Sequence, residues 1–345
     1  MKILIAGGAG FIGSTVASAC LDAGHQPIIL DDLSTGRREY VRGRPFVHAQ
    51  IGDRDALEQA FTDHSDIVAA IDLAAYIDVP ASSSDPARYY ENNVSQSLAF
   101  IRHLAQFGCH RVVFSSSASV YGPSADFGVD EQSELDPKSP YARTKLMCEW
   151  MLEDIAKAGA ISAIALRYFN PIGADPKLRT GPQSANPSHV LGKIIQAGQS
   201  GGAFTITGTD WPTPDGTGLR DYVHVWDIAT AHVAAVERFD SINATNGPFV
   251  VINLGSGQPC TVRQLISAYE SVAGAELKVI DGPRRAGDSI GSYTRSRRAK
   301  DLLGWRPEHT LATGIRDSLR WAERRRDVLE ADPNRPRRDI TREPT

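Results

Sequence analysis

A run of three glycines near the N-terminus constrains the fold of this chain more than any other feature. Residues 2–6 form a short apolar run with the branched side chains of a buried parallel strand. Gly7, Gly10 and Gly13 follow at once with the spacing G-x-x-G-x-x-G, and residues 14–23 have the composition of a helix. Glycines between a strand and a helix allow a tight turn and bring the helix N-terminus close to a phosphate. The segment therefore predicts a strand–turn–helix unit that binds a dinucleotide.

The next predicted strand, residues 27–30, runs into two carboxylates. Asp31 stands at the end of this strand, where a carboxylate can accept hydrogen bonds from the two ribose hydroxyls of a dinucleotide and would repel a 2′-phosphate. Asp32 adds to that repulsion. The pair predicts that the cofactor is NAD rather than NADP. The competing interpretation is an acidic strand end without a ligand.

Strand-like and helix-like segments continue to alternate along the first half of the chain. Further strands are predicted at residues 66–73, 111–115 and 161–166, and helices at residues 87–106 and 141–157. This alternation is typical of a parallel sheet with helices on both faces. The predicted fold class is therefore α/β, with a Rossmann-type doubly wound parallel sheet.

The alternation loosens beyond residue 170, where proline, glycine and polar residues become frequent up to residue 187. We therefore expect an NAD-binding domain over residues 1–170, to which some later segments return. A smaller C-terminal α/β lobe for the substrate is expected over residues 171–322. Residues 323–345 are rich in Arg, Asp, Glu and Pro, and we expect them to form a charged, flexible tail.

Composition and charge exclude several classes of function. The net charge of −4 provides no broad positive field for a nucleic acid or an anionic membrane. No apolar run approaches the roughly 18 residues that span a bilayer. The cysteines Cys20, Cys109, Cys148 and Cys260 are scattered, without a Cys-x-x-Cys pair or a Cys/His cluster. We therefore expect no bound metal and a reducing, cytoplasmic location.

A serine-rich strand end and a tyrosine–lysine pair carry the predicted chemistry. One predicted strand leads into Ser115, Ser116 and Ser117, and the carboxyl ends of strands are where an open α/β sheet binds ligands. Tyr141 and Lys145 lie one turn apart on a predicted helix, so the ammonium can sit beside the phenol and the cofactor ribose. Lys145 and the positive nicotinamide are expected to lower the pKa of Tyr141, which then takes a proton. Ser117 would hold the substrate oxygen for that transfer.

With these motifs the chain resembles the extended short-chain dehydrogenases/reductases, and within them the UDP-glucose (UDP-galactose) 4-epimerases. The glycine turn and the tyrosine–lysine pair are common to the whole superfamily. The runs RYFNPIGA and DGTGLRDYVHV are specific to the epimerase group. The resemblance extends over nearly the whole chain, up to about residue 305. The segments that carry it are residues 7–13, 115–122, 141–145, 167–174, 215–225, 253–257 and 284–288.

The resemblance implies an isomerase whose reaction has no net redox change. Bound NAD⁺ would oxidise the C4 hydroxyl of a UDP-hexose to a ketone, with Tyr141 taking the proton. Hydride would return to the other face after the sugar turns in the site. Ser117, Tyr141 and Lys145 are then the catalytic residues. Family members pair through the helices that correspond to residues 87–106 and 141–157, so a homodimer is expected.

The resemblance also assigns binding residues, position by position. At the cofactor it places Gly7, Gly10, Phe11, Ile12, Gly13, Asp31, Asp32, Gln50, Ile51, Leu73, Ala74, Ala75, Asn93, Ser115, Tyr141, Lys145 and Tyr168. At the substrate it places Ser117, Tyr141, Asn170, His189, Thr205, Arg220, Arg285, Asp288 and Ser292. Arg220 and Arg285 would bind the diphosphate through their planar guanidinium groups. Asn170 would contact a phosphate or the sugar, and Asp288 the uridine ribose. Asn93 would order the strand end behind the catalytic serine and tyrosine.

Some positions depart from the family pattern. Gln50 precedes Ile51 where the family usually has Asp-Ile at the adenine, and Ile77 stands where a lysine is common. Residues 73–75 read Leu-Ala-Ala in place of Phe-Ala-Gly. His189 stands where an asparagine normally touches the nucleotide. These departures weaken an assignment to galactose metabolism more than they weaken the prediction of NAD binding.

Ser292 aligns with a position whose bulk admits or blocks the 2-substituent of the sugar in this family. Its small side chain predicts that UDP-N-acetylhexosamines are accepted as well as UDP-hexoses. The alternatives on the same scaffold are a UDP-glucuronate 4-epimerase, or a dehydratase or decarboxylase of another NDP-sugar. A dehydratase would be expected to have an acidic pair after Ser117, where this chain has Ala-Ser-Val. A third interpretation is a non-enzymatic dinucleotide-binding protein, which the set of Ser117, Tyr141 and Lys145 disfavours.

Overall fold

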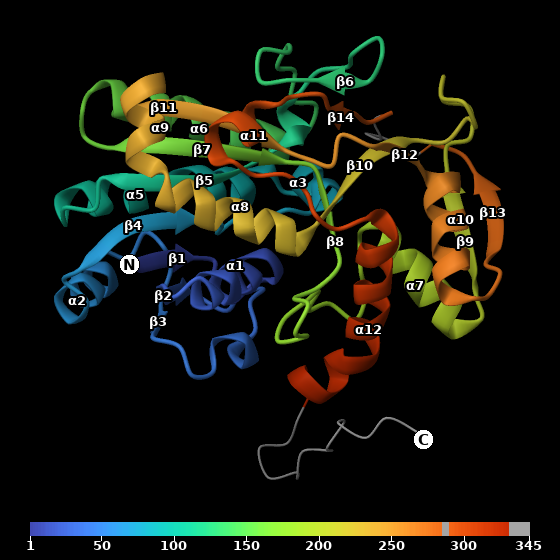
Figure 1. Ribbon diagram of the computed structural model, residues 1–345, viewed down its shortest axis with the longest axis horizontal. Coiled ribbons are helices and arrows are strands. Elements are labelled where there is room, and N and C mark those ends of the chain that lie inside the picture. Colours follow the sequence, from blue (N-terminus) through green and yellow to red (C-terminus); the bar gives the residue numbers. More distant parts are fainter. Residues whose placement is uncertain (285–289, 331–345) are drawn as a thin grey trace.

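The computed structural model describes residues 1–284 and 290–330, and it has two unequal parts that lie side by side (Figure 1). The larger part is built on one sheet of seven parallel strands in the order β11-β7-β5-β4-β1-β2-β3. These strands are β1 (Lys2–Ala6), β2 (Gln26–Asp31), β3 (Phe46–His48), β4 (Ile67–Asp72), β5 (Arg111–Ser117), β7 (Ser162–Tyr168) and β11 (Phe249–Leu254). The chain steps outward from β1 in one direction and from β4 in the other. The sheet is therefore doubly wound, with its switch point between β1 and β4.

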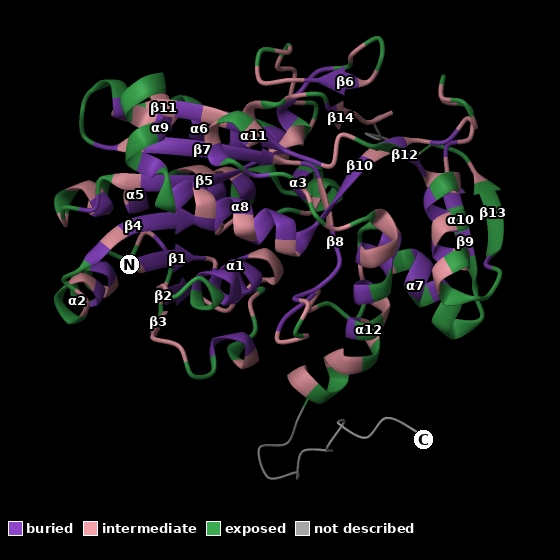
Figure 2. Ribbon diagram, viewed as in Figure 1, coloured by how far each residue is buried: buried purple, intermediate pink, exposed green. Residues whose placement is uncertain are grey.

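Helices cover both faces of this sheet. On one face lie α1 (Phe11–Asp22), α8 (Val225–Glu237) and α9 (Phe239–Asn246), packed against strand residues such as Ile5 and Ile71. On the other face lie α2 (Arg54–Asp63), α5 (Gln96–Gln106) and α6 (Pro140–Lys157), packed against residues such as Leu4 and Phe114. Strands buried on both faces read as continuous apolar runs rather than alternating ones. Figure 2 shows these strands buried along most of their length.

The smaller part has a core of its own, at the right of Figure 1. Its three-stranded sheet is formed by β8 (Asn170–Ile172), β10 (Leu219–His224) and β12 (Pro259–Thr261), and a parallel pair by β9 (Ala203–Thr207) and β13 (Lys278–Gly282). The helices α7 (Val190–Ser200), α10 (Val262–Ala273) and α12 (Leu311–Leu329) enclose it. The first strand of this part, β8, begins two residues after the end of β7, so the two parts share one stretch of chain.

The C-terminal helix ties the smaller part to the larger one. The Trp321 ring of α12 lies 6.1 Å from the ring of Tyr40, measured between centroids. The Trp321 Nε1 donates to the Pro182 carbonyl at 2.9 Å, and the Tyr40 hydroxyl donates to the Gly181 carbonyl at 2.6 Å. The chain also returns to the large sheet in α8, α9 and β11, so residues after 170 contribute to both parts.

Short elements complete the fold. The helical ones are η1 (Arg38–Val41), α3 (Val79–Ser84), α4 (Pro86–Tyr90), η2 (Glu91–Ser95), η3 (Ala118–Val120) and α11 (Arg298–Leu303), and the strands β6 (Gly128–Val129) and β14 (Tyr293–Thr294) pair in parallel. The single helix predicted over residues 87–106 is thus α4, a π-helical turn at η2, and α5. Asn93 lies in that wider turn. Its side chain bonds the backbone of Tyr76 and the hydroxyl of Thr144, which a regular helix pattern does not reveal.

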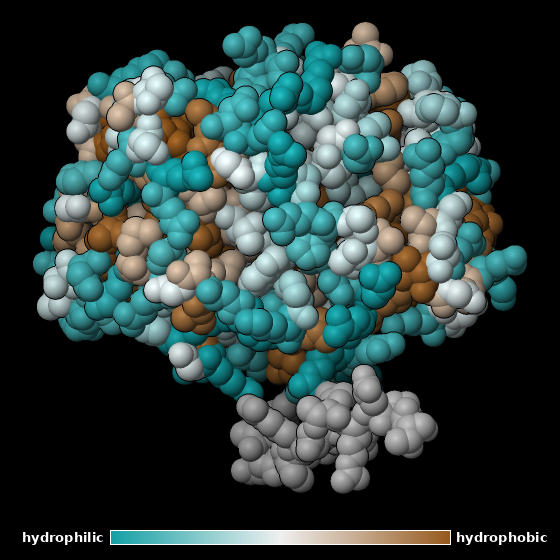
Figure 3. Space-filling model, viewed as in Figure 1, coloured by the Kyte–Doolittle hydropathy of each residue, from teal (hydrophilic) through white to brown (hydrophobic). Residues whose placement is uncertain are grey.

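The face shown in Figure 3 is predominantly hydrophilic, with small separate apolar patches. Within residues 1–284 and 290–330, no helix combines the length and apolar character that a membrane span requires. The same ranges contain no group of three or more His, Cys, Asp or Glu side chains placed to hold a metal ion. All four cysteines are buried and free.

Candidate active site

The turn between β1 and α1 can be built only from small residues. Gly7 has a φ of +74°, and a Cβ there would lie 2.8 Å from the backbone nitrogen of Ala74. A Cβ on Gly13 would lie 2.2 Å from the carbonyl oxygen of Gly7, inside any normal contact distance. At Gly10 the nearest atom would be 3.4 Å away, so this glycine leaves space for an approaching group rather than relieving a clash. The three glycines therefore have different roles in one cradle.

The N-terminus of α1 faces this cradle. Gly10 is the residue before the first helical turn, and no side chain accepts a hydrogen bond from that turn. The first N–H groups of a helix have no partner within the helix, and they carry a partial positive charge. Phe11, Ile12 and Gly13 contribute these groups, and a pyrophosphate fits the space that Gly10 leaves. The residues present therefore fit a dinucleotide.

Asp31 does more than the sequence interpretation assigned to it. Its Oδ2 accepts a hydrogen bond from the Ala9 N–H at 2.9 Å, and its Oδ1 accepts one from the Leu33 N–H at 2.8 Å. Burial raises the pKa of this carboxyl, and the two backbone N–H groups act in the opposite direction. Each carboxylate oxygen retains a lone pair for a ribose hydroxyl. Asp32, beside it, accepts from the Ser34 N–H at 2.8 Å.

Other predicted cofactor residues lie in the loop after β4, in the turn after β3 and in the π-helical turn η2. Ala74 and Leu73 are in the loop after β4 that approaches Gly7, and Ala75 continues that loop. Gln50 is exposed and Ile51 is buried in the turn after β3. Asn93 is only 2% exposed and bonds the backbone of Tyr76 through both its Oδ1 and Nδ2 atoms. Asn93 therefore holds the loop after β4 in place.

Lys145 joins α6 to β5. Its ammonium donates a hydrogen bond of 2.7 Å to the Ser115 carbonyl oxygen and lies 4.9 Å from the centre of the Phe114 ring. The Ser115 hydroxyl is bonded to the Tyr168 hydroxyl of β7. Lys145 is 3% exposed, and burial lowers the pKa of its ammonium. Three elements of the larger part, α6, β5 and β7, therefore meet at Ser115.

Tyr141 and Ser117 face each other at the end of β5. Tyr141 lies in the first turn of α6, which Ser139 caps by accepting the Ala142 N–H at 3.2 Å. Burial raises the pKa of the Tyr141 phenol to about 12, and the hydrogen bond with Ser117 opposes the rise only in part. The expected lowering of this pKa depended on the nicotinamide as well as on Lys145, and in the protein alone the pKa is raised instead. Desolvation is the largest influence on this pKa, and the Lys145 ammonium donates to the Ser115 carbonyl rather than to the phenol.

A buried ion pair under the serines was missing from the sequence interpretation. Glu149 on α6 accepts a hydrogen bond from the Arg167 Nε at 2.8 Å and another from the Ser116 hydroxyl. Arg167 also donates to the Tyr121 hydroxyl at 2.9 Å, and this hydroxyl donates to the Asn253 Oδ1 at 2.6 Å. This network holds the end of β5 against α6 and β7. Glu149 lies one turn beyond Lys145, and this spacing was the signal that could have marked it.

The smaller part contains a cavity with a volume of about 640 Å³. Thr205, Arg220 and Tyr222 line it, together with residues of α7. The Arg220 Nη1 donates to the carbonyl oxygens of Leu219 at 2.7 Å and Ile290 at 2.9 Å, which fixes the guanidinium. The Tyr222 hydroxyl is buried without a hydrogen-bond partner among the described residues. A polar ligand that enters this cavity would meet both a cation and a phenol.

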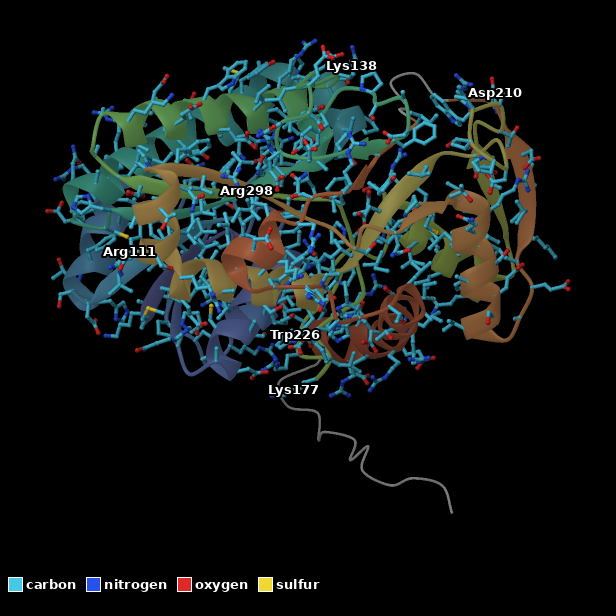
Figure 4. All side chains as sticks on the ribbon, turned by 45° about the horizontal axis from the view of Figure 1, so that its top comes forward. Arg111, Lys138, Lys177, Asp210, Trp226 and Arg298 are labelled. Atoms are coloured by element: carbon cyan, nitrogen blue, oxygen red, sulfur yellow. The ribbon has the colours of Figure 1, made fainter. Side chains whose placement is uncertain are left out.

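The mouth of this cavity carries a stacked pair. Trp211 lines the cavity, and the Arg284 guanidinium lies 3.7 Å from the centre of its ring. Arg284 also donates to the Asp210 carboxylate at 2.7 Å. In Figure 4, Asp210 lies at the outer end of the smaller part, at the opposite end of the molecule from Arg111.

The predicted substrate residues do not all line this cavity. His189 is the residue before α7, and its Nδ1 accepts a hydrogen bond from the Gly192 N–H at 3.1 Å. Asn170 pairs in register with Tyr222, so β8 leads from the end of β7 to a strand that lines the cavity. Ser292 directly precedes β14. Arg285 and Asp288 lie outside the described residues.

Comparison with known proteins decides the family. Residues 3–255 match the NAD dependent epimerase/dehydratase family. The chain belongs to this family. The resemblance inferred from its motifs is thereby confirmed, and so is NAD as the cofactor that the glycine turn and Asp31 predict.

Relatives in the family are similar over almost their whole length. The chain is 38% identical to the UDP-glucose 4-epimerase of Azospirillum brasilense, over 93% of this chain and 91% of that one. It is 39% identical to the UDP-glucose 4-epimerase of Neisseria meningitidis serogroup C, over 93% of this chain and 96% of that one.

Solved structures confirm the fold class. The UDP-glucose 4-epimerase of Stenotrophomonas maltophila, crystallised with NAD and formylated UDP-arabinopyranose, superposes with a TM-score of 0.88 at 34% identity and covers 94% of this chain and 98% of that one. The enzyme of Brucella ovis in complex with NAD gives a TM-score of 0.87 at 35% identity, over 93% and 98% of the two chains. The predicted Rossmann-type α/β fold of this family member is therefore confirmed.

Proposed function

We propose that the protein is an NAD-dependent epimerase that inverts C4 of a UDP-hexose, interconverting UDP-glucose and UDP-galactose through a transient 4-keto sugar. One observation carries the proposal: Ser117 and Tyr141 meet at the carboxyl end of β5, in the same parallel sheet whose β1–α1 turn forms the dinucleotide cradle. Relatives at 38–39% identity named UDP-glucose 4-epimerase support the same reaction.

The proposed chemistry needs one proton acceptor and one group that orients the sugar. When bound, NAD⁺ supplies the hydride acceptor and a positive charge beside the phenol. Such a charge favours the phenolate and offsets the effect of burial on the pKa of Tyr141. Tyr141 then removes the proton from the C4 hydroxyl and later returns it. Ser117 hydrogen-bonds the same oxygen and keeps it in line with the phenol.

Inversion also requires that the sugar turns while the nucleotide stays bound. The groups suited to the nucleotide lie in the smaller part, where Arg220 is fixed by two carbonyl oxygens and Trp211 offers an aromatic face. We assign the diphosphate to Arg220, with Arg285 as its partner, and the uridine to the cavity that Thr205 lines, with Asp288 at its ribose. Asn170 and His189 would contact the nucleotide sugar from β8 and the start of α7. A firm grip on the nucleotide leaves the hexose free to rotate.

Ser292 supports a wider sugar specificity. A serine hydroxymethyl group is small enough to leave space for an N-acetyl substituent at C2. Solved structures with the same fold include a UDP-Glc/GlcNAc 4-epimerase of Campylobacter jejuni, at 32% identity and a TM-score of 0.78. Turnover of UDP-N-acetylgalactosamine by the purified protein, and its selective loss in Ser292→Tyr, would support this specificity. If Ser292→Tyr lost UDP-galactose turnover to the same extent as UDP-N-acetylgalactosamine turnover, the role of Ser292 in sugar specificity would be contradicted.

We also propose that the enzyme works in the cytoplasm as a homodimer. Trp150 on α6 is 54% exposed and Leu98 on α5 is 37% exposed, so these helices present apolar side chains to solvent. A second copy of the same pair of helices would cover them. The four buried thiols fit a reducing compartment. Analytical ultracentrifugation of the protein and of Trp150→Glu tests the dimer, because a charge there should give monomers.

One experiment separates the proposed function from its rivals. The purified protein is analysed for bound NAD(H) and incubated with a panel of UDP- and dTDP-sugars, with products identified by NMR. Interconversion of UDP-glucose and UDP-galactose supports the proposal. UDP-galacturonate formed from UDP-glucuronate, a 4-keto-6-deoxysugar or released CO₂ would favour the rival enzymes. Bound cofactor without any product would favour a non-enzymatic role.

A further inference from the structure

A buried carboxylate beside the catalytic lysine has no part in the mechanism derived above. Asp72 is the last residue of β4 and is 1% exposed. It pairs in register with Phe114 of β5, and like Ala70 it projects from the sheet face that α5 and α6 cover. Its Oδ1 accepts the Ala74 N–H at 3.2 Å. Among the described residues its Oδ2 is buried and has no hydrogen bond of regular geometry, and the nearby Ser97 hydroxyl lowers the pKa of this carboxyl.

Lys145 lies over the same part of the sheet. Its ammonium lies above the ring of Phe114, which is the register partner of Asp72 on the neighbouring strand. Burial lowers the pKa of Lys145, and the charge of Asp72 is the largest influence that raises it. Burial likewise raises the pKa of Asp72, and the charge of Lys145 is the largest influence that lowers it. Each group therefore stabilises the charged form of the other.

The other carboxylate near Lys145 already has a partner. Glu149 is held by the Arg167 guanidinium through its Nε at 2.8 Å and its Nη2 at 2.5 Å. Among the described residues, no arginine, lysine or histidine lies in direct contact with Asp72. A carboxylate in an apolar core is costly unless a cation lies nearby. With Glu149 paired to Arg167, Asp72 is the remaining carboxylate that acts on Lys145 among the described residues, and Lys145 is the cation that acts on Asp72.

We propose that Asp72 is a positioning residue that acts as the counter-ion of Lys145 and keeps the ammonium charged beside Tyr141 and the cofactor ribose. The inference rests on the catalytic role of Lys145 in the proposed function. It gives a reason for a carboxylate in the core, where an apolar residue would pack without a desolvation cost.

Among the described groups around Lys145, Asp72 has the charge that most affects the pKa of the ammonium. Burial raises the pKa values of the Cys148 thiol and the Tyr168 phenol, so both are neutral near pH 7, as is Tyr141 in the protein alone. Arg167 neutralises Glu149. The groups that face the pair are Tyr141, Cys148 and Glu149 on α6, Ser97 on α5, the Ser115 carbonyl on β5 and Tyr168 on β7.

The first test is the pH dependence of kcat for UDP-galactose in Asp72→Asn. Asparagine keeps the shape of the side chain but removes the charge, so the Lys145 pKa falls and the alkaline limb of the profile moves down by about one pH unit. Ser97→Ala is the neutral comparison, because it removes a buried hydroxyl that also lowers the pKa of Asp72 but removes no charge. Its alkaline limb should move less than that of Asp72→Asn. A folded, NAD-containing Asp72→Asn with the wild-type profile would show that Asp72 is neutral and overturn the proposal.

The second test measures the interaction between Asp72 and Lys145 through protein stability, without an activity assay. Thermal midpoints are measured for the wild type, Asp72→Asn, Lys145→Met and the double variant. Asp72→Asn should lower the midpoint when Lys145 is present and raise it in the Lys145→Met background, where the carboxylate would otherwise be left alone. A change of the same sign in both backgrounds would refute the pairing. Because this cycle needs no turnover, its failure is distinguishable from failure of the proposed epimerase function.

Discussion

The Lys145 ammonium donates a hydrogen bond of 2.7 Å to the carbonyl oxygen of Ser115, two residues before Ser117 on the same strand. This bond fixes the helix that carries Tyr141 against the strand that carries Ser117. The two hydroxyls that would act on the substrate are therefore positioned by backbone elements rather than by free side chains. Such positioning lowers the entropic cost of bringing reacting groups together.

Replacing Tyr141 with phenylalanine should remove the proton acceptor and leave the cofactor site intact. We expect kcat to fall by a factor of about 10²–10⁴, the usual contribution of a positioned acid–base group. Bound NAD, measured by absorbance after release, should stay at the wild-type level because the glycine cradle is unchanged. Tyr269→Phe is the control, since this phenol lies on α10 in the smaller part. A Tyr141→Phe enzyme with undiminished kcat would overturn the assigned role.

Alanine at Gly13 and alanine at Gly10 should have different effects. The Gly13 Cβ would lie 2.2 Å from the Gly7 carbonyl oxygen, so the turn must shift, and we expect a loss of about 2 kcal/mol in the free energy of unfolding. The Gly10 Cβ meets nothing closer than 3.4 Å. Gly10→Ala should therefore fold normally and lose NAD, because the methyl group occupies the space of the pyrophosphate. Urea unfolding and NAD content measure the two effects, and equal stability of both variants would contradict this division.

Asp31→Asn should weaken both the loop and the cofactor site. An amide has one acceptor oxygen, so one of the N–H groups of Ala9 and Leu33 loses its partner, at a cost of about 1–3 kcal/mol. The repulsion of a 2′-phosphate also falls, so the preference for NAD over NADP should narrow. Calorimetric titration with both dinucleotides measures that preference. Asp32, the half-buried neighbour of Asp31, offers a control. Asp32→Asn should change the preference for NAD over NADP less than Asp31→Asn does. A larger change in Asp32→Asn would be inconsistent with Asp31 as the ribose ligand.

A buried histidine should make the fold sensitive to mild acid. His232 on α8 is fully buried, its Nδ1 bonds the Ile228 carbonyl at 2.8 Å, and burial lowers its pKa to about 4. Because the unfolded chain binds this proton near pH 6.5, the stability that His232 provides is complete above pH 6.5 and is lost as the pH falls toward 4. We expect about 2 kcal/mol less stability at pH 5 than at pH 7 from this residue.

Urea unfolding of the wild type and His232→Asn at both pH values isolates this contribution. Asparagine can donate to the Ile228 carbonyl but has no proton to gain in this range. Other groups that titrate are shared by both proteins and cancel in the difference. Parallel losses in the two proteins would show that His232 is not the sensitive group.

Local spacing was enough to predict the cradle and the catalytic pair. Gly7, Gly10 and Gly13 lie within a single turn, and Tyr141 and Lys145 lie on one helical face, so the geometry follows from neighbouring residues. The alternation of elements likewise determined a parallel α/β sheet. These features depend on short-range sterics and on the residue periods of helix and strand. Both can be read from a short stretch of sequence.

Tertiary structure decided the electrostatics of the site. Glu149 meets Arg167, and Asp72 faces Lys145, only because β4, β5 and β7 lie side by side under α6. The sign of the pKa shift of Tyr141 also follows from its burial in the folded chain, which no spacing of residues expresses. Charges separated by long stretches of chain interact strongly only after folding excludes water and fixes their distance. The motifs thus predicted which groups would react, and the packing of the sheet and helices determines the electrostatic surroundings of these groups.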